Sequence, residues 1–181
     1  MAARLHEKYK QEVAPELVKR FSLKNTMAVP RVKKIVISMG MGNAHEDKAK
    51  LETAVNQLTA IAGQKPIITH AKTSISNFKL REGMEVGLKV TLRGARMWEF
   101  LDRLVTLAIP RVKDFRGLNP SGFDGRGNYN MGLGEQTVFP EIDPASVTFT
   151  QGMNIAMQTT ARTDEQAREL LTLLGMPFRK G

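Results

Sequence analysis

The chain has 181 residues, no cysteine, and a net charge of +9 from 27 Lys and Arg against 18 Asp and Glu. This length fits one domain, and the lack of cysteine excludes a disulfide scaffold, a thiol nucleophile and a cysteine-ligated metal site. No stretch approaches the ~18 apolar residues of a membrane span, and the charged N-terminus has no apolar signal-peptide region. We therefore expect a soluble, cytoplasmic protein.

The positive charge is concentrated in two segments. Residues 1–40 and residues 64–116 each carry a net charge of +6, whereas the segments 41–63 and 117–181 are slightly acidic. A uniformly basic surface is the alternative, but this uneven distribution favours a basic patch. Such a patch predicts a polyanionic partner, with nucleic acid ahead of an anionic membrane.

The first half of the chain alternates helical and extended patterns. Apolar residues at every fourth position over Leu5–Phe21 predict an amphipathic helix, with a kink or restart at Pro15. The β-branched run Arg31–Met39 is typical of a buried strand. A helix is expected over Glu46–Ala62 and a short strand over Pro66–Thr69.

The middle of the chain contains the clearest strand pattern. Val86–Leu92 alternates apolar residues with polar and cationic ones, which predicts a strand with one buried face and one polar face. Helical spacing follows over Ala95–Ile109 and stops at Pro110. The segment Arg111–Glu135 has six glycines and little periodicity, so a long loop is expected there.

The C-terminal part predicts two more strands and a helix. Thr137–Phe139 is a short strand candidate, Met153–Thr160 alternates as a half-buried strand, and Thr163 begins a capping box before the last helix. The elements predict an α+β fold, with one mainly antiparallel sheet and helices packed on one face. We expect one domain over residues 1–181, with an extended loop region at about 111–145.

The sequence offers little support for catalysis or for a cofactor. Its three histidines have no metal-ligand spacing, and the acidic pairs at 46–47 and 164–165 lie where helices begin. Gly40–Asn43 follows a strand and precedes a helix, as phosphate-binding turns do, but it lacks the third glycine and a Walker lysine. We therefore expect a non-enzymatic protein without a cofactor or a metal. A nucleotide-binding enzyme that uses the turn Gly40–Asn43 is the alternative.

The pattern between Lys65 and Arg96 is typical of RNA binding. Cations there are interleaved with hydroxyl and amide side chains, which suits the neutralisation and positioning of phosphates. For any single cation, a solvated position without an RNA contact is the alternative. Lys89 and Arg93 share one strand face and would point the same way, which favours a common binding surface. A free regulatory protein that binds messenger or double-stranded RNA is a further alternative.

Several colinear segments carry a resemblance to a known family. They are VPRVKKIVISMGMG (29–42), LTAIAGQKPIITHAKTSISNFKLREGMEVG (58–87), KVTLRGARMWEFLDRL (89–104), IPRVKDFRGLNPSGFDGRGNYNMGLGEQTVFPEI (109–142) and PFRK (177–180). They closely resemble the bacterial large-subunit ribosomal protein five family, which binds 5S rRNA. The resemblance covers nearly the whole chain.

This resemblance implies a structural protein of the large ribosomal subunit, located in its central protuberance. It implies binding to 5S rRNA and 23S rRNA, contact with P-site tRNA and with other central-protuberance proteins, and an intersubunit bridge to small-subunit ribosomal protein thirteen. The residues expected to contact rRNA are Lys33, Lys34, Gln64, Lys65, Lys72, Ser74, Lys89 and Arg93. A loop facing the tRNA would include Asn77, Phe78, Lys79, Arg81 and Gly83, and the intersubunit contact would include Arg111, Lys113, Asp114, Phe115, Glu141 and Asp143.

Four positions depart from the pattern of that family. Ser38 stands where Asn is common, and His70, Thr73 and Gly134 stand at commonly basic positions. Each departure removes a potential phosphate contact, so we assign these four residues no role. Losing two of ~6–10 such contacts weakens RNA binding without abolishing it.

Overall fold

A five-stranded antiparallel sheet organises the protein, and the computed structural model describes residues 3–42, 48–147 and 149–179. In the order β2-β3-β1-β5-β4, β1 occupies the centre of the sheet between β3 and β5. The strands are β1 (Val32–Gly40), β2 (Ile67–His70), β3 (Glu85–Leu92), β4 (Tyr129–Leu133) and β5 (Met153–Thr159).

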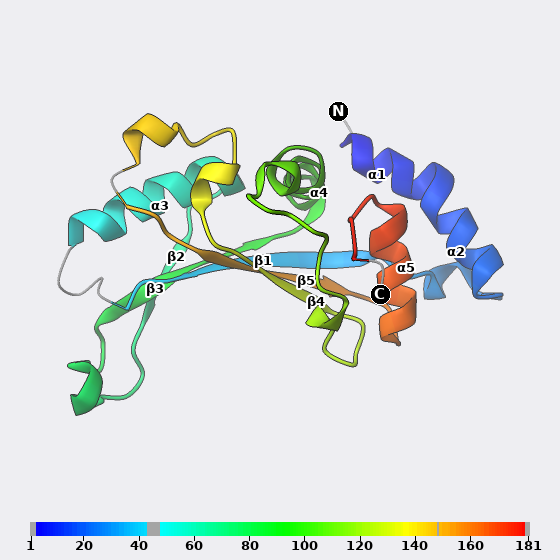
Figure 1. Ribbon diagram of the computed structural model, residues 1–181. Helices are drawn as coiled ribbons and strands as arrows, with labels where there is room; N and C mark the ends of the chain where they lie inside the picture. The colour runs from blue at the N-terminus through cyan, green and yellow to red at the C-terminus, as the bar shows by residue number, and fades with distance from the viewer. Residues whose placement is uncertain (1–2, 43–47, 148, 180–181) are drawn as a thin grey trace.

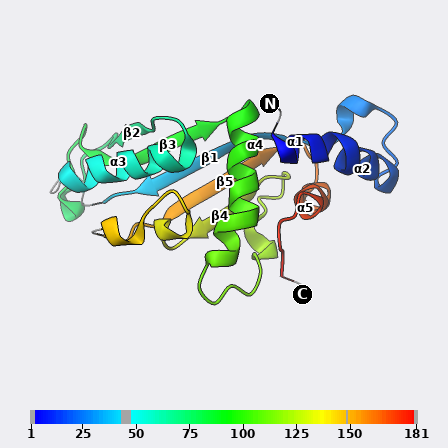
Figure 2. The same cartoon turned by 90° about the horizontal axis from the view of Figure 1, so that it is seen from above.

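The α-helices lie to one side of the sheet and at one end of it. α3 and α4 cover one face, with α4 running across the strands (Figures 1 and 2). The arrangement confirms the expected α+β fold, although the predicted start of the second helix at Glu46 lies outside the described residues. The helices are α1 (Arg4–Lys8), α2 (Ala14–Arg20), α3 (Lys48–Ala62), α4 (Gly94–Arg103) and α5 (Asp164–Leu173).

The N-terminal helix restarts at Pro15, as predicted. One π-helical turn, Tyr9–Val13, joins α1 to α2, which begins at Ala14 with Pro15 and Glu16 in its first turn, and the chain stays helical throughout. Proline lacks an N–H and its ring crowds the carbonyl of residue i−4, and a wider turn before it relieves both conflicts. The helix predicted over Ala95–Ile109 runs from α4 through a π-helical turn, Leu104–Ala108, and ends in the 3₁₀ turn Ile109–Arg111, which contains Pro110.

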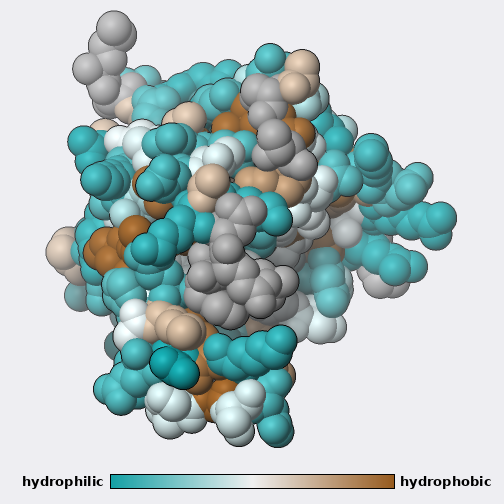
Figure 3. Space-filling view, turned by 90° about the vertical axis from the view of Figure 1, so that its left-hand side faces the viewer, coloured by the Kyte–Doolittle hydropathy of each residue, from teal (hydrophilic) through white to brown (hydrophobic). Residues whose placement is uncertain are grey.

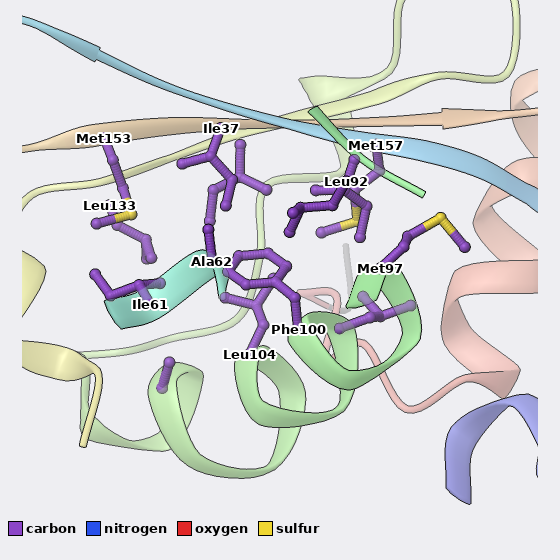
Figure 4. Close-up of a cluster of buried hydrophobic side chains, with 14 of the residues drawn as sticks. Ile37, Ile61, Ala62, Leu92, Met97, Phe100, Leu104, Leu133, Met153 and Met157 are labelled. Atoms are coloured by element: carbon purple, nitrogen blue, oxygen red, sulfur yellow. The ribbon is translucent and has the colours of Figure 1, made fainter. Parts of the chain in front are cut away.

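The core fills the space between the sheet and α3 and α4. Ile37 from β1, Leu92 from β3 and Met157 from β5 meet Phe100 of α4 and Ile61 of α3 (Figure 4). All five side chains are buried, and burial stabilises by roughly 25 cal/mol for each Å² of apolar surface removed from water. The apolar half of each alternating strand pattern therefore faces the helices, as predicted.

Two expectations for the glycine-rich region are wrong. The segment expected as a loop includes β4, which pairs with β5 through Tyr129, Met131 and Leu133 and extends the sheet. Thr137–Phe139, expected as a strand, instead covers the end of the 3₁₀ turn Gln136–Val138 and the residue after it.

Gln136 explains why the second segment turns instead of pairing. Its side chain is fully buried, its amide donates to the Phe149 carbonyl at 2.7 Å, and its Oε1 accepts the Gln151 N–H at 2.6 Å. A buried amide must be hydrogen-bonded, and these bonds hold the chain in the turn before β5.

Candidate nucleic-acid interface

The second face of the sheet is polar and is not covered by an α-helix at its centre, as far as the described residues show (Figure 1). Because side chains alternate along a strand, the residues between the core positions point to this side. We call it the open face; it consists of Lys34, Val36, Ser38, Ile67, Thr69, Gly87, Lys89, Thr91, Asn130, Gly132, Asn154, Ala156 and Gln158.

The strand register arranges these residues in rows across the sheet. One row runs from Ile67 through Lys89, Ser38 and Asn154 to Gly132. Directly opposed residues of antiparallel strands have Cβ atoms about 4.5–5.5 Å apart, so each row is continuous. The row presents an ammonium, a hydroxyl and an amide in succession.

The next row is built of small and polar side chains. It joins Thr91, Val36, Ala156 and Asn130, and none of these side chains is large enough to stand far above the backbone. Hydroxyl and amide groups between short side chains allow a rigid partner to approach the sheet closely. This surface suits the sugar-phosphate backbone of a folded nucleic acid.

Positive charge converges at the end of the sheet where β3 leaves it. Lys34 follows the bulge between Val32 and Lys34, and Arg93 is the residue after β3. Since Ile35 pairs with Leu92, Lys34 and Arg93 are adjacent across the two strands. Lys89 and Arg93 are exposed, and neither has an ion pair within the described part of the chain.

Gln64 and Lys65 lie beside this end of the sheet. They connect α3 to β2, and Ile67, two residues after Lys65, pairs with Lys89 of the open face. Gln64 Oε1 accepts a hydrogen bond from Arg96 of α4 at 3.3 Å. The structure therefore brings five of the predicted rRNA-contacting residues together: Lys34, Gln64, Lys65, Lys89 and Arg93.

The other three predicted rRNA residues lie elsewhere. Lys72 and Ser74 belong to the segment between β2 and β3, and Lys33 is exposed in the β1 bulge, where it lines a cavity next to the N-terminal helix. The Ser74 hydroxyl accepts the Glu82 N–H at 2.9 Å, which gives that side chain an internal role.

Residues 71–84 form a loop that extends from one end of the sheet, away from the helices (Figure 1). We call it the projecting loop. Ile75 and Leu80 exchange backbone hydrogen bonds of 2.9 and 3.1 Å, and at the base Gly83 N–H donates to the Ala71 carbonyl at 3.0 Å. Lys79 adopts a left-handed backbone with φ of 51°, which ends the turn at the tip.

The tip of the projecting loop combines charge with apolar surface. Phe78 is 72% exposed, and Lys79 and Arg81 are exposed beside it. Apolar and hydrophilic side chains both reach the surface at this lower end of the molecule (Figure 3). The structure thus groups Asn77, Phe78, Lys79, Arg81 and Gly83, as the sequence predicted for one loop.

The predicted intersubunit residues fall into two groups. Arg111 and Lys113 are exposed, and Lys113 lies 3.7 Å from Glu135. Asp114 is exposed in a left-handed conformation, with φ of 51°. These three residues form one short surface segment.

The remaining three have internal contacts. Phe115 packs against the core, Glu141 forms an ion pair with Arg103 of α4, and Asp143 accepts the Ala145 N–H at 3.0 Å. Arg103 also donates to the Ile61 carbonyl at 3.0 Å, so the Glu141 carboxylate helps to hold α3 and α4 together.

The described residues contain no group of three or more His, Asp or Glu that could hold a metal ion. No helix in ranges 3–42, 48–147 and 149–179 is long and apolar enough to cross a membrane. The turn Gly40–Asn43 is described only as far as Gly42, and its first residue, Gly40, ends β1 opposite Gly87 of β3.

Comparison with known proteins decides the family. Residues 25–81 match the family described as ribosomal protein L5, and residues 85–178 match the ribosomal L5P family C-terminus. The chain belongs to the uL5 family. Its relatives named large ribosomal subunit protein uL5 include one from Thermoanaerobacter sp. (strain X514), 58% identical over 98% of this chain and 99% of the relative. Those from Thermus aquaticus and Thermus thermophilus are 60% and 59% identical, over 97% of both chains in each case.

Membership of the uL5 family makes this chain a non-enzymatic, structural and RNA-binding constituent of the large ribosomal subunit. Both matched segments contribute to one sheet, because β1 and β2 lie in the first and β3, β4 and β5 in the second. The open face is therefore complete only when the two segments pair.

Sequence reasoning missed several residues of the open face. Thr91, Asn130, Asn154 and Gln158 lie in rows with the predicted cations. The polar half of the alternation in β5 is visible in the sequence and could have pointed to Asn154 and Gln158. The sequence does not show the order of strands, which places these residues beside the cations. Asn154 stands directly opposite Ser38, so an amide lies one strand away from the Ser38 hydroxyl.

Proposed function

We propose that the open face binds 5S rRNA and that the chain attaches 5S rRNA to 23S rRNA in the central protuberance. The observation that carries this proposal is the convergence of Lys34, Lys89 and Arg93 on an uncovered sheet face made of short polar side chains. The cations neutralise phosphates, and the hydroxyl and amide rows fix the register of the RNA backbone.

Recognition by this face depends on the shape of the RNA. The described open face carries no aromatic ring on which a base could stack, so recognition relies on backbone geometry and 2′-hydroxyls. A rigid sheet suits a folded RNA better than a flexible single strand. This favours 5S rRNA over unstructured messenger RNA.

Equilibrium binding of the purified protein to folded 5S rRNA, and to a length-matched control RNA across a salt series, tests the proposal. We expect tight binding to 5S rRNA at physiological salt and weaker, more steeply salt-dependent binding to the control. Equal affinity for both RNAs at every salt concentration would contradict it and would indicate non-specific attraction by the net charge of +9.

We further propose that the projecting loop contacts P-site tRNA and that the surface at Arg111, Lys113 and Asp114 contacts small-subunit ribosomal protein thirteen. The support for the first contact is the exposed Phe78 beside Lys79 and Arg81, since an aromatic ring stacks on a nucleotide while cations bind its phosphates. The support for the second is the short charged segment after α4.

The triple variant Phe78→Ser, Lys79→Asn, Arg81→Ser tests the role of the projecting loop. Asn tolerates the left-handed backbone at position 79, so the loop keeps its shape. We expect nearly unchanged affinity for 5S rRNA and faster dissociation of P-site tRNA from reconstituted ribosomes. The control Lys19→Ser, Lys24→Ser removes as much charge from the far end of the molecule, and it should leave both properties unchanged. A large loss of 5S rRNA affinity in the triple variant would refute the separation of roles.

A further inference from the structure

A cavity of about 380 Å³ opens where the N-terminal helix passes the starts of β1 and α4. It lies at the same end of the sheet as Lys34 and Arg93, because Gly94 in its lining follows Arg93 and Lys33 in its lining precedes Lys34. None of the contacts predicted for the tRNA-facing loop or the intersubunit segment involves this cavity.

Aromatic rings form one wall of the cavity. The ring of Trp98 stacks with His6 at 5.2 Å between centroids and meets the tilted ring of Tyr9 at 5.5 Å. The Tyr9 hydroxyl donates to the Pro30 carbonyl at 3.0 Å, which fixes the orientation of that ring. Burial raises the pKa of Tyr9, with opposition from the charge of Arg31, so the hydroxyl stays protonated and keeps this bond.

The charged part of the lining is exclusively cationic. Lys10, Arg31 and Lys33 line the cavity, no Asp or Glu does, and none of the three has an ion pair among the residues described. The backbone of Arg31 is held on both sides: its N–H donates to Thr160 Oγ1 and its carbonyl accepts the Thr160 N–H, each at 3.0 Å. The guanidinium therefore extends from a fixed position.

We propose that this cavity binds an unpaired nucleobase of ribosomal RNA, with the adjoining phosphate on Arg31 and Lys33. A base requires an apolar, partly aromatic slot, and its phosphate requires cations at the rim; the cavity supplies both. Met27, 82% exposed, adds a flexible apolar side chain at the mouth. The inference rests on the proposed function, because RNA on the open face would bring its strand to the mouth.

Trp98 provides a direct measurement, because it is the only tryptophan of the chain and lines the cavity. The full-length protein is titrated with tetraadenylate and with an abasic ribose-phosphate tetramer of equal charge, and Trp98 fluorescence is recorded. We expect a saturable change with tetraadenylate, and about 5-fold or more weaker binding of the abasic tetramer, since stacking contributes about 1–3 kcal/mol per base. Equal binding of the two tetramers, or no change in fluorescence, would overturn the proposal.

Variants locate the binding. Lys33→Glu reverses a charge at an exposed position, so it should weaken tetraadenylate binding while the melting temperature stays unchanged; Lys19→Glu, on α2, is the matched control and should bind normally. Tyr9→Leu removes one aromatic ring from the cavity wall and should also weaken tetraadenylate binding. If Tyr9→Leu lowers the melting temperature, the result for Lys33→Glu alone decides whether the cavity binds tetraadenylate. Equal losses in Lys33→Glu and Lys19→Glu would overturn the proposal.

Two further titrations separate this proposal from its rivals. Saturable quenching by tetraglutamate at least as strong as that by tetraadenylate would indicate an acidic protein segment and overturn the nucleobase site. Binding of 5S rRNA is measured on the same preparation. Tight 5S rRNA binding without a tetraadenylate response would refute the cavity site alone, whereas the converse would refute the role of the open face.

Discussion

The Lys89→Ala, Arg93→Ala variant is expected to bind 5S rRNA about 10- to 100-fold more weakly than the unaltered protein at physiological salt. Both residues are exposed, and the core side of β3 consists of Leu88, Val90 and Leu92, so the fold should not change. Each lost phosphate contact also reduces the salt slope of binding by about 0.7–0.9. The double variant should therefore show a slope smaller by about 1.4–1.8.

Filter binding or fluorescence anisotropy over a salt series measures both quantities. Lys19→Ala, Lys24→Ala removes the same charge from the region of α2 and should change the slope little. An unchanged slope in the Lys89 and Arg93 variant would show that the open face does not meet RNA. A fall in melting temperature would instead assign the loss of binding to the fold.

The second large effect is expected at Gly127, next to the N-terminus of α5. Gly125 and Gly127 both have positive φ angles, of 80° and 78°, and both donate their N–H groups to the Asp164 carboxylate, at 3.0 and 2.8 Å. A Cβ on Gly127 would lie 2.8 Å from the Ala161 carbonyl oxygen, whereas a Cβ on Gly125 would meet nothing within 4 Å. The two glycines thus share backbone strain but differ in the space around them.

Gly125→Ala should lower the free energy of unfolding by about 1–2 kcal/mol, the cost of a left-handed alanine. Gly127→Ala should lower it by about 3–5 kcal/mol, because the backbone must also shift away from Ala161. Urea denaturation of both variants gives the comparison. Equal losses would show that the loop moves freely and that the contact with Ala161 does not restrain it.

A network of short hydrogen bonds makes such movement costly. The Asp124 carboxylate accepts the Arg126 and Asn128 N–H groups at 2.8 and 3.0 Å, and the hydrogen bond from the Asn128 side chain contributes most to lowering the pKa of Asp124 below its usual range. Thr159 at the end of β5 donates to the Gly127 carbonyl at 2.6 Å. The loop is therefore tied to both the sheet and α5.

Hydrophobic periodicity in the sequence predicted those helices and strands that bury one face against the core. The alternation in β3 and β5 and the helical spacing in α3, α4 and α5 each reflect one face against the core, and the structure confirms them. β4 was missed because its short alternation lies within the glycine-rich segment Arg111–Glu135, and glycine is depleted in strands. Pairing with β5 outweighs that local preference.

The candidate site was predictable in part. Lys89 and Arg93 could be placed on one polar strand face from the sequence alone, because alternation fixes side-chain direction. The other members of the row that contains Lys89 could not be placed, since Ser38 and Asn154 are 51 and 65 positions from Lys89 in the chain. Only the strand order puts Ser38 opposite Lys89 and Asn154 opposite Ser38. Nor does local pattern reveal that Glu141, expected at an intersubunit surface, pairs with Arg103.

The central position of β1 sets the order in which the nascent chain can fold. One edge of β1 pairs with β3, which is synthesised soon afterwards, but the other edge waits for β5 at residues 153–159. At about 5–20 residues per second, translation leaves that edge unpaired for roughly 6–23 s after β1 is made.

During this interval an apolar strand with free backbone groups is available for incorrect pairing. We therefore expect newly made chains to depend on chaperones, and overexpression without their supply to yield aggregates seeded by β1. When the protein is made in excess over its RNA, we expect proteases to degrade it fastest before β5 has been synthesised, while one edge of β1 is still unpaired.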